Sequence, residues 1–528
     1  MTDKQAIPAE VEIRYEPRQP VSDPTLGIPV AAGKPKKAKH RLVTIGDSLT
    51  HGFMSGAVFR TDLSWPAITA YELGLKFDEF RFPVYEWPTG PGGLPFDLER
   101  FVRAFEKRYG DRLDFWEIVG AALWIQRYMD DIEDRWEDYK APASGPPFHN
   151  MGVYGWDVLD TVQLTATTIA ERLRQAPKDD PFKQFVEHHQ DVASWPVLQR
   201  ARRGNRGQSV LDAVGAMSKT DGVETLVVIL GANNALGTVV NLELAWTPAD
   251  YAKLSPEQRM SAKRGCTVFR PSSFAADWKL LVDKLRTVTA QHVLIATVPS
   301  VTIAPIARGT HRKVNPQSRY FPHYTRPWIT DDDFDPSRDP CLTEDEARAV
   351  DSTIDAFNEI IIDSVKAART DGHDWYLFDM GGVLDSLASR RYIESPWARP
   401  SWWKPYDLPP ALQALDPVPS TRFFRSGREG RTDGGLISLD GVHPTTIGYG
   451  ILAQEVIRIM RLAGIEFRGQ DGQVRPDPVQ IDFDRLLLAD TLVSRPPAAI
   501  TNTLSLLGWL DQRLDWVRKL LPFVPSPL

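Results

Sequence analysis

His40-Arg41-Leu42-Val43-Thr44-Ile45-Gly46-Asp47-Ser48-Leu49 is the stretch of this 528-residue chain that decides the expected fold. Its short apolar run stops at a glycine, which is typical of a buried strand. Further runs of this kind cover residues 224–230, 292–298 and 374–378. Helical patterns separate them, and this alternation predicts an α/β protein whose parallel sheet is covered by helices on both faces.

The helical patterns define the frame between the strands. They cover residues 115–139, 157–174, 274–290, 343–370 and 447–462. Several of them place apolar side chains at the three-to-four spacing of a helix that buries one face. We find no internal repeat in the chain, so the prediction is one α/β frame rather than a solenoid or an array.

Three long segments interrupt the frame and are predicted to be insertions. Residues 53–147 are rich in aromatic residues, whereas 300–342 and 386–436 are polar and rich in Pro and Arg. Residues 1–39 are Pro-rich and end in a basic run, which predicts a flexible arm or a strap across the surface. Residues 471–528 are predicted to be a C-terminal extension, so the expected α/β frame covers 40–470.

Composition excludes several classes of protein. Hydrophobic residues make up 42% and charged residues 25% of the chain, as in ordinary globular proteins. The 62 Lys and Arg residues against 69 Asp and Glu residues give a net charge of −7, which argues against a general nucleic-acid binder. The two cysteines, Cys266 and Cys341, are too few for a metal site or a disulfide framework. No apolar run has the length of a signal peptide or a membrane span, so we expect a cytoplasmic protein.

Ser48 follows the first strand directly, and ligands of open α/β sheets bind at the carboxyl ends of the strands. Thr50 stands where the nucleophile elbow of α/β-hydrolases needs a glycine, which disfavours that family. A serine nucleophile needs a base, and the base needs a carboxylate that orients it. Asp440-Gly441-Val442-His443 offers both on one tight loop. Each motif alone also fits a helix cap or a turn.

Acyl transfer further needs donors at the oxygen on which negative charge develops. Leu230-Gly231-Ala232-Asn233-Asn234 ends the second strand and places the Asn233 amide at the same sheet edge as Ser48. Asn150-Met151-Gly152-Val153-Tyr154-Gly155 precedes a helix, where backbone N–H groups are free to bind an anion. Taken singly, these segments equally fit turn residues and helix caps.

The four segments occur in the order Ser, Gly, Asn, Asp-x-x-His, and this set resembles the four blocks of the GDSL esterases and lipases, also called SGNH hydrolases. Residues 46–49 resemble the first block, 150–155 the second, 231–234 the third and 440–444 the last. The resemblance covers the frame from about 40 to 465. It implies a three-layer α/β/α sandwich with a flavodoxin-like parallel sheet of about five strands.

The resemblance also implies roles for individual residues. Ser48 is expected to be the nucleophile, and its own N–H a donor to the oxyanion. Gly155 is expected to add a backbone N–H and Asn233 its side-chain amide. His443 is expected to act as general base and then as general acid, oriented by Asp440. No metal or organic cofactor is implied.

The chain departs from the family pattern at two points. Asn234 replaces the usual Asp of the third block, which affects an expected supporting hydrogen bond. The second block holds two glycines, and either Gly152 or Gly155 fits the oxyanion donor. Trp397, Trp402 and Trp403 lie in the third insertion, and either line an acyl or sugar site or pack that insertion onto the protein.

The expected function is the hydrolysis of carboxylic esters by a lipase or esterase through an acyl-enzyme, with a small-molecule or lipid ester as substrate. The alternatives are an esterase for carbohydrate or other polar acyl groups, an acyltransferase of the same fold, and a non-catalytic binding protein. Leu507 to Leu521 has the pattern of an amphipathic helix that ends at Pro522. Such a helix either docks on the protein or a second subunit, or lies on a lipid interface.

Overall fold

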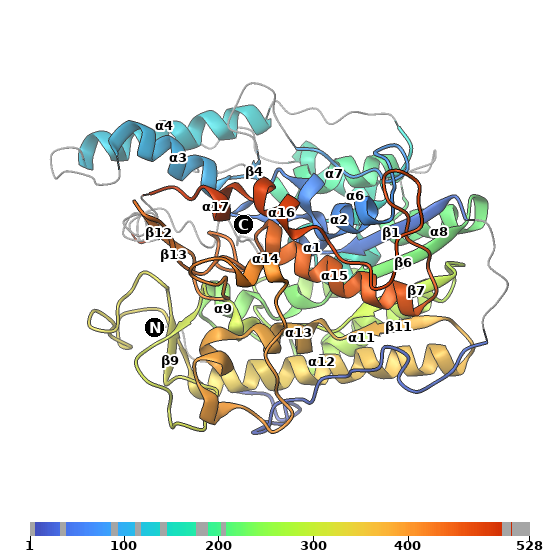
Figure 1. The fold of residues 1–528 in the computed structure, drawn as a ribbon. Helices are drawn as coiled ribbons and strands as arrows, with labels where there is room; N and C mark the ends of the chain where they lie inside the picture. Colours follow the sequence, from blue (N-terminus) through green and yellow to red (C-terminus); the bar gives the residue numbers. More distant parts are fainter. Residues whose placement is uncertain are drawn as a thin grey trace.

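The computed structural model describes residues 6–31, 38–85, 93–110, 118–137, 145–175, 188–201, 207–498 and 508. A five-stranded sheet lies at the centre of this part of the chain, with helices around it (Figure 1). The predicted α/β class is therefore confirmed. The predicted C-terminal helix around residues 507–521 lies outside the described residues.

The strands of the central sheet are parallel throughout. They are β1 (His40–Gly46), β5 (Asn150–Gly152), β6 (Val223–Ile229), β7 (His292–Ala296) and β11 (Trp375–Phe378). Their order across the sheet is β11-β7-β6-β1-β5. In chain order this is 2-1-3-4-5, a doubly wound arrangement whose direction reverses between β1 and β6. A ligand site is expected at that reversal, beyond the carboxyl ends of β1 and β6.

The helices of the described residues have the following bounds: α1 (Ser48–His51), α2 (Trp65–Glu72), α3 (Leu98–Tyr109), α4 (Ile118–Glu137), α5 (Val158–Gln163), α6 (Ala166–Gln175), α7 (His189–Ala201), α8 (Val210–Thr220), α9 (Gly237–Asn241), α10 (Pro256–Ala262), α11 (Pro271–Leu285), α12 (Glu344–Thr370), α13 (Met380–Leu387), α14 (Pro410–Gln413), α15 (Thr446–Leu462), α16 (Phe483–Ala489) and α17 (Thr491–Ser494). Helices α5, α8, α11 and α12 pack side by side, and α2 packs against α15 (Figure 1). A right-handed doubly wound sheet of this order places these two groups on opposite faces.

Four of the predicted helices match observed ones, but the helix predicted over 157–174 is two helices. Leu164 is extended, and the Thr165 hydroxyl accepts a hydrogen bond of 3.3 Å from the Thr168 N–H. A side-chain hydroxyl that caps a new helix in this way interrupts an apolar pattern that otherwise looks continuous. The buried core is continuous through both helix layers. In one of them the stacked rings of Phe274 and Phe357, 4.0 Å apart, join α11 to α12.

The insertions form small sheets at the edges of the frame. Strands β2 (Phe53–Met54), β3 (Ala57–Val58) and β4 (Leu94–Pro95) make one antiparallel sheet. Two further sheets consist of β8 (Arg308–Gly309), β9 (His323–Thr325) and β10 (Leu342–Thr343), and of β12 (Arg425–Gly427) and β13 (Gly430–Asp433). The predicted insertion 53–147 is too wide, because α2 lies within it and packs against α15 as part of the frame.

Residues 6–31 lie as a strap along α12 and β11 rather than as a free arm. The Arg14 guanidinium binds both carboxylate oxygens of Glu359 in α12, and the Leu377 N–H of β11 donates to the Pro24 carbonyl. Asp379 anchors the middle of the strap. Its carboxylate accepts hydrogen bonds from Arg18, the Val21 N–H and the Thr297 hydroxyl. In the described residues, no helix is long and apolar enough to cross a membrane.

We predict that Asp379→Ala lowers the free energy of unfolding by about 3 kcal/mol, because it leaves a buried guanidinium without its partner. The side chains of Asp379 and Arg18 are only 7% and 12% exposed. Asp371→Ala is the matched control. The Asp371 side chain pairs with Arg286 but is 53% exposed, so this ion pair should contribute less than about 1 kcal/mol. Urea unfolding measures the loss of unfolding free energy in each variant. Equal losses would show that the strap contact is no stronger than a surface ion pair.

Candidate active site

Ser48 lies where the sheet order reverses, as the first residue of α1. The strand before it ends at Gly46, where a Cβ would lie 2.6 Å from the Ile229 carbonyl oxygen of β6 and 2.1 Å from the Thr50 hydroxyl. The side chain of Asp47 caps α1 by accepting a 3.1 Å hydrogen bond from the Leu49 N–H. The turn from β1 into α1 is therefore tight, and it fixes Ser48 at the carboxyl edge of the sheet.

The structure brings together the three residues expected to form a triad. Ser48 Oγ is 2.8 Å from His443 Nε2, and His443 Nδ1 is 3.0 Å from Asp440 Oδ2. An ionised carboxylate only accepts hydrogen bonds, so Nδ1 carries the proton. Nε2 is then an acceptor for the Ser48 hydroxyl. All three side chains are at most 3% exposed.

Asp440 is held by four N–H donors. Its Oδ1 accepts from the backbone N–H groups of Val442 (2.9 Å) and His443 (2.8 Å). Its Oδ2 accepts from the Gly56 N–H at 3.0 Å and from the His443 ring. Burial by itself raises the pKa of Asp440, but the nearby His443 and these hydrogen bonds outweigh it and hold the pKa below its ordinary value. The carboxylate therefore stays ionised beside His443.

The hairpin that supplies the Gly56 donor was not predicted from the sequence. Ser55, between β2 and β3, has a φ of 51° and donates its N–H to the Ser438 hydroxyl at 2.8 Å. The Leu439 N–H donates back to the Ser55 hydroxyl at 3.4 Å. These bonds join the hairpin to the loop that carries Asp440. The Ser-Gly pair is a recognisable turn signal in the sequence, but its partner lies 384 residues away.

A hydrogen bond joins one expected oxyanion donor, Asn233, to the residue that follows another, Gly155. The side-chain amide of Asn233, in the short 3-10 turn after β6, donates to the Trp156 carbonyl at 2.7 Å. This bond fixes the Asn233 amide next to the Gly155 loop and leaves its second N–H for another acceptor. Ser48 begins a helix, so its N–H has no partner within that helix.

Gly155 suits the donor role better than Gly152 does. The Gly152 N–H already donates to Asn150 Oδ1 at 3.0 Å, whereas no acceptor binds the Gly155 N–H within the described residues. Gly155 has a φ of 78°, which favours glycine, and a Cβ there would overlap the Gln190 side chain. Gly152 is needed for packing, since a Cβ would lie 2.5 Å from the His51 backbone nitrogen.

Asn234, which departs from the family pattern, is buried behind the donor. Its Oδ1 accepts a long hydrogen bond of 3.4 Å from the Val158 N–H at the start of α5. Its Nδ2 is buried and has no partner among the described residues. A carboxylate would accept the same hydrogen bond without burying an unused donor. Asn234 therefore keeps the contact with Val158, but the contact stabilises the fold less than a carboxylate would.

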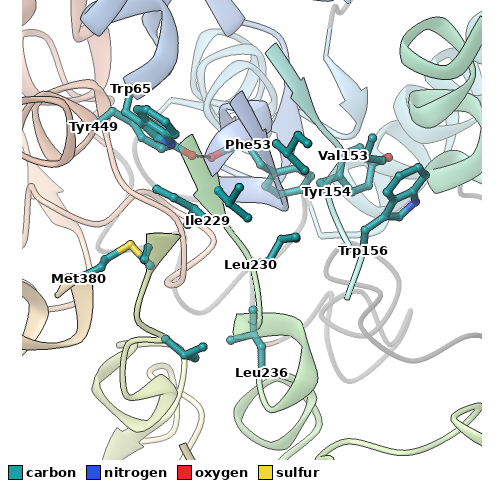
Figure 2. Packing of buried hydrophobic residues seen from close by; sticks show 14 of the residues in the cluster. Phe53, Trp65, Val153, Tyr154, Trp156, Ile229, Leu230, Leu236, Met380 and Tyr449 are labelled. Carbon is teal, nitrogen blue, oxygen red and sulfur yellow. Dashed lines mark hydrogen bonds between the residues drawn. The ribbon is translucent and has the colours of Figure 1, made fainter. Parts of the chain in front are cut away.

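A neutral histidine, absent from the sequence-based prediction, supports the turn below Ser48. His51 Nδ1 accepts from the Tyr154 N–H at 3.1 Å, so Nε2 donates to the Tyr85 hydroxyl 3.0 Å away. Burial lowers the pKa of His51 to about 3. The Phe53 ring lies between Tyr154 and the His443 ring, with centroids 4.9 Å and 4.6 Å from theirs. Figure 2 shows Phe53 beside Tyr154. These contacts hold the serine turn and the His443 ring in place.

An apolar cavity of about 120 Å³ opens at Ser48 and His443. Among its lining residues in the described chain, only these two, Ser300 and Thr421 have polar side chains. The walls come from the segment that follows β6, from α13 and α15 and from the second insertion; they include Leu236, Val301, Ile303, Met380, Leu384 and Ile451. Figure 2 shows Leu236 and Met380 beneath the carboxyl end of β6. The cavity is suited to a hydrocarbon group.

The three tryptophans of the third insertion do not line this cavity. Trp403 packs on the Tyr392 ring at 5.8 Å, and the Arg399 guanidinium lies 4.7 Å from its ring centre. Trp397 is 81% exposed. The expectation that they pack the insertion applies to Trp403, and to Trp402, which packs against the same cluster, but not to the exposed Trp397. Within the described residues, no cluster of His, Cys, Asp and Glu is arranged to bind a metal ion.

Asp47 is a buried carboxyl group close to His443. Its Oδ2 has no hydrogen-bond partner among the described residues, and burial raises the pKa of Asp47 to about 7. The pKa in the unfolded chain is near 3.8. The folded protein therefore binds this proton more tightly, and stability falls as the pH rises from about 4 towards 7 and beyond.

Asp47→Asn should remove this pH dependence, since the amide keeps the oxygen that caps α1 but does not ionise. We expect the stability of the variant relative to wild type to increase between pH 5 and pH 8, by about 3 kcal/mol. Asp250→Asn, at an exposed position, measures the effect of losing a surface carboxylate. Urea unfolding at pH 5 and pH 8 measures the difference in unfolding free energy between the variant and wild type. A difference that stays constant with pH would mean that Asp47 is ionised normally in the folded protein.

Comparison of the chain with protein-family models, with curated proteins and with solved structures found no match.

Proposed function

We propose that the chain is a serine hydrolase that cleaves carboxylic esters, with the three-layer fold and the four motif blocks of a GDSL, or SGNH, hydrolase. The observation that carries this proposal is the unbroken chain of hydrogen bonds Ser48–His443–Asp440 at the mouth of an apolar cavity. A serine with only a structural role, such as capping a helix, does not require a histidine partner. A histidine with only a structural role does not require a serine at the mouth of a cavity. The combination is the geometry of nucleophilic catalysis.

Acylation would begin at the Ser48 hydroxyl, whose proton His443 Nε2 accepts as Oγ attacks the ester carbonyl. The imidazolium that forms is stabilised by the ionised Asp440 at Nδ1. His443 then donates the proton to the departing alcohol oxygen. The acyl group is left on Ser48 as an ester, and the carboxylate of Asp440 does not itself take up the proton.

Negative charge develops on the carbonyl oxygen during the attack. The Ser48 N–H, the Gly155 N–H and the free N–H of the Asn233 amide are the donors available for it. Asn233 is fixed beforehand by its bond to Trp156, so this donor needs little reorganisation. In the second half of the reaction, His443 activates water, which releases the acid and restores Ser48.

The cavity lining supports an acyl chain as the group bound beside Ser48. Aliphatic side chains recover the free energy of burying a hydrocarbon, at about 25 cal/mol for each Å² removed from water. A sugar ring would bring hydroxyl groups that this lining leaves without partners, at a cost of about 1–3 kcal/mol each. An esterase for fatty acyl groups is therefore favoured over an esterase for carbohydrate.

Ser48→Ala should lower kcat for a 4-nitrophenyl acyl ester by about 10⁶-fold, and His443→Ala by a similar factor, because triad members act as a unit. Asp440→Asn should cost about 10⁴-fold, since the wrong ring tautomer is then favoured. Ser300→Ala is the matched control, a serine of the same cavity without a contact to His443. It should retain nearly full activity. Wild-type turnover in folded Ser48→Ala would exclude the proposed function.

Asn233→Ala should lower kcat by about 10²–10³-fold with little change in KM, which is the effect of losing one oxyanion donor. Asn234→Ala should cost clearly less, because its side chain contacts the start of α5 rather than the reacting carbonyl. Steady-state kinetics on one ester separates the two. A larger loss for Asn234→Ala would show that the donor is assigned to the wrong asparagine.

A further inference from the structure

A second cavity of about 130 Å³ adjoins the one at Ser48. Ile303, Pro305 and Thr421 line both cavities, so a single layer of side chains separates them. The same layer contacts the catalytic loop, because the Ile306 N–H donates to the Gly441 carbonyl at 3.0 Å. The second cavity is built by segments of the second and third insertions, which the proposed reaction itself does not use.

The lining of this second cavity is strongly cationic. Six of its residues are arginines: Arg308, Arg319, Arg390, Arg391, Arg422 and Arg425. In the described residues, Asp433 is the only acidic side chain in the lining. Three of the arginines are neutralised by carboxylates at short range: Arg308 by Asp331, Arg391 by Asp351, and Arg422 by Glu394 and Asp433. The remaining three form no ion pair within the described residues, although Asp351, Asp355 and Asp385 lie near enough to Arg319 to stabilise its charge.

Arg319 is buried with two unused donors. The residue is 7% exposed, and its Nε and Nη2 atoms form no hydrogen bond within the described residues. The Tyr392 hydroxyl lies beside its guanidinium. The nearby Asp351 is already engaged, since its carboxylate accepts from Thr302, Tyr320 and Arg391. A buried guanidinium with unused donors costs stability unless a ligand supplies the acceptors.

Arg390 has a similar excess of donors. It makes one hydrogen bond of 2.7 Å, to the Gly309 carbonyl, and its guanidinium lies 4.8 Å from the centre of the Phe321 ring. No carboxylate pairs with it in the described part of the chain. Burial lowers the pKa of Arg390, and the neighbouring Arg308 and Arg422 lower it further. Arg425 is exposed, lines the same cavity and forms no ion pair with a residue that the structure describes.

A nearby lysine is affected by the same excess of positive charge. Lys313 donates to the Arg391 carbonyl at 2.6 Å and lies 5.7 Å from the Phe321 ring centre. Burial, followed by the charge of Arg391, lowers the pKa of Lys313 to about 7, although Glu394 acts in the opposite direction. An anion bound in the cavity would relieve the repulsion among these cations.

We propose that this cavity binds an anionic group, a carboxylate or a phosphate, carried by the ester substrate, so that the enzyme acts on anionic esters. The inference rests on the proposed function, because it assigns the group that lies in the cavity next to Ser48. The planar forks of Arg319 and Arg390 match the oxygen pairs of a carboxylate or phosphate. A neutral ester would leave both forks unsatisfied.

Two matched pairs of substrates test the proposal. The first pair has the charge on the acyl side: the mono-4-nitrophenyl esters of C6 to C10 diacids, each compared with its methyl ester. The second has a phosphate on the alcohol side: 3-(hexanoyloxy)propyl phosphate compared with 3-(hexanoyloxy)propanol. We expect the charged member of at least one pair to have a kcat/KM higher by about 10- to 100-fold, the effect of charged hydrogen bonds. The pair that shows it distinguishes a carboxylate on the acyl side from a phosphate on the alcohol side.

Arg319→Met and Arg390→Gln should remove this preference while leaving kcat/KM for the neutral members unchanged. Arg312→Gln is the control, an exposed arginine of the same insertion outside the cavity lining. If Arg319→Met does not fold, Arg390→Gln alone carries the test. The absence of a preference in both pairs, or an equal loss on charged and neutral esters, would overturn the proposal.

A binding measurement separates this proposal from the proposed function. Calorimetric titration with inorganic phosphate, at constant ionic strength, should show binding to wild type and to Ser48→Ala, and at least about tenfold weaker binding to Arg390→Gln. Hydrolysis of no ester together with this binding pattern would refute the esterase but support the anion site. Hydrolysis without a charge preference, and without phosphate binding that depends on Arg390, would refute the anion site alone.

Discussion

The buried carboxylate of Asp440 is the group on which the candidate site depends. A carboxylate removed from water needs donors for both oxygens, and here four N–H groups from the Gly56 hairpin, the His443 loop and the His443 ring supply them. These bonds fix the loop that follows the last insertion against a hairpin that follows Ser48. The same carboxylate fixes the tautomer of His443 and so determines that Nε2 accepts from Ser48.

Much of the frame could be predicted from the sequence because buried parallel strands are short continuous apolar runs. The strands β1, β6, β7 and β11 have this pattern. Strand β5 does not, since Asn150 to Gly152 is only three residues long and begins and ends with Asn and Gly. Its pairing with β1 is accompanied by hydrogen bonds from the Asn150 side chain to the Thr50 carbonyl and the Gly152 N–H. Such a strand depends on a tertiary contact that no local pattern reveals. The division of α5 from α6 depends similarly on one hydroxyl cap.

Part of the candidate site could likewise be predicted from the sequence, and part could not. Ser48, Asn233 and the Asp440–His443 loop were found because each residue type follows a strand or precedes a helix where chemistry is expected. The Gly56 N–H and the neutral His51 were missed, because their roles depend on backbone groups that approach from distant segments. The unpaired donors of Arg319 and Arg390 were missed for a related reason. Both arginines lie in Arg-rich insertions, and only the fold shows which of those arginines find carboxylates.

Under the two proposals, the insertions line the cavities that bind the substrate, whereas the frame positions the catalytic residues. One cavity offers aliphatic walls beside Ser48, and the other offers unused guanidinium donors one side-chain layer away. The hydrophobic walls supply binding energy without direction, whereas the guanidinium forks fix an orientation. An ester held at both ends would present its carbonyl to Ser48 in one pose, which is the condition for a fast intramolecular attack.

The proposed mechanism requires Ser48 to be a nucleophile activated by His443. Reaction of the purified chain with a fluorophosphonate, followed by mass spectrometry of the peptides, tests this requirement. We expect one phosphonyl group per chain, on Ser48, and a labelling rate that falls sharply in His443→Ala, because the serine hydroxyl is a weak nucleophile without its base. The absence of labelling, or labelling at another residue with Ser48 unmodified, would contradict it.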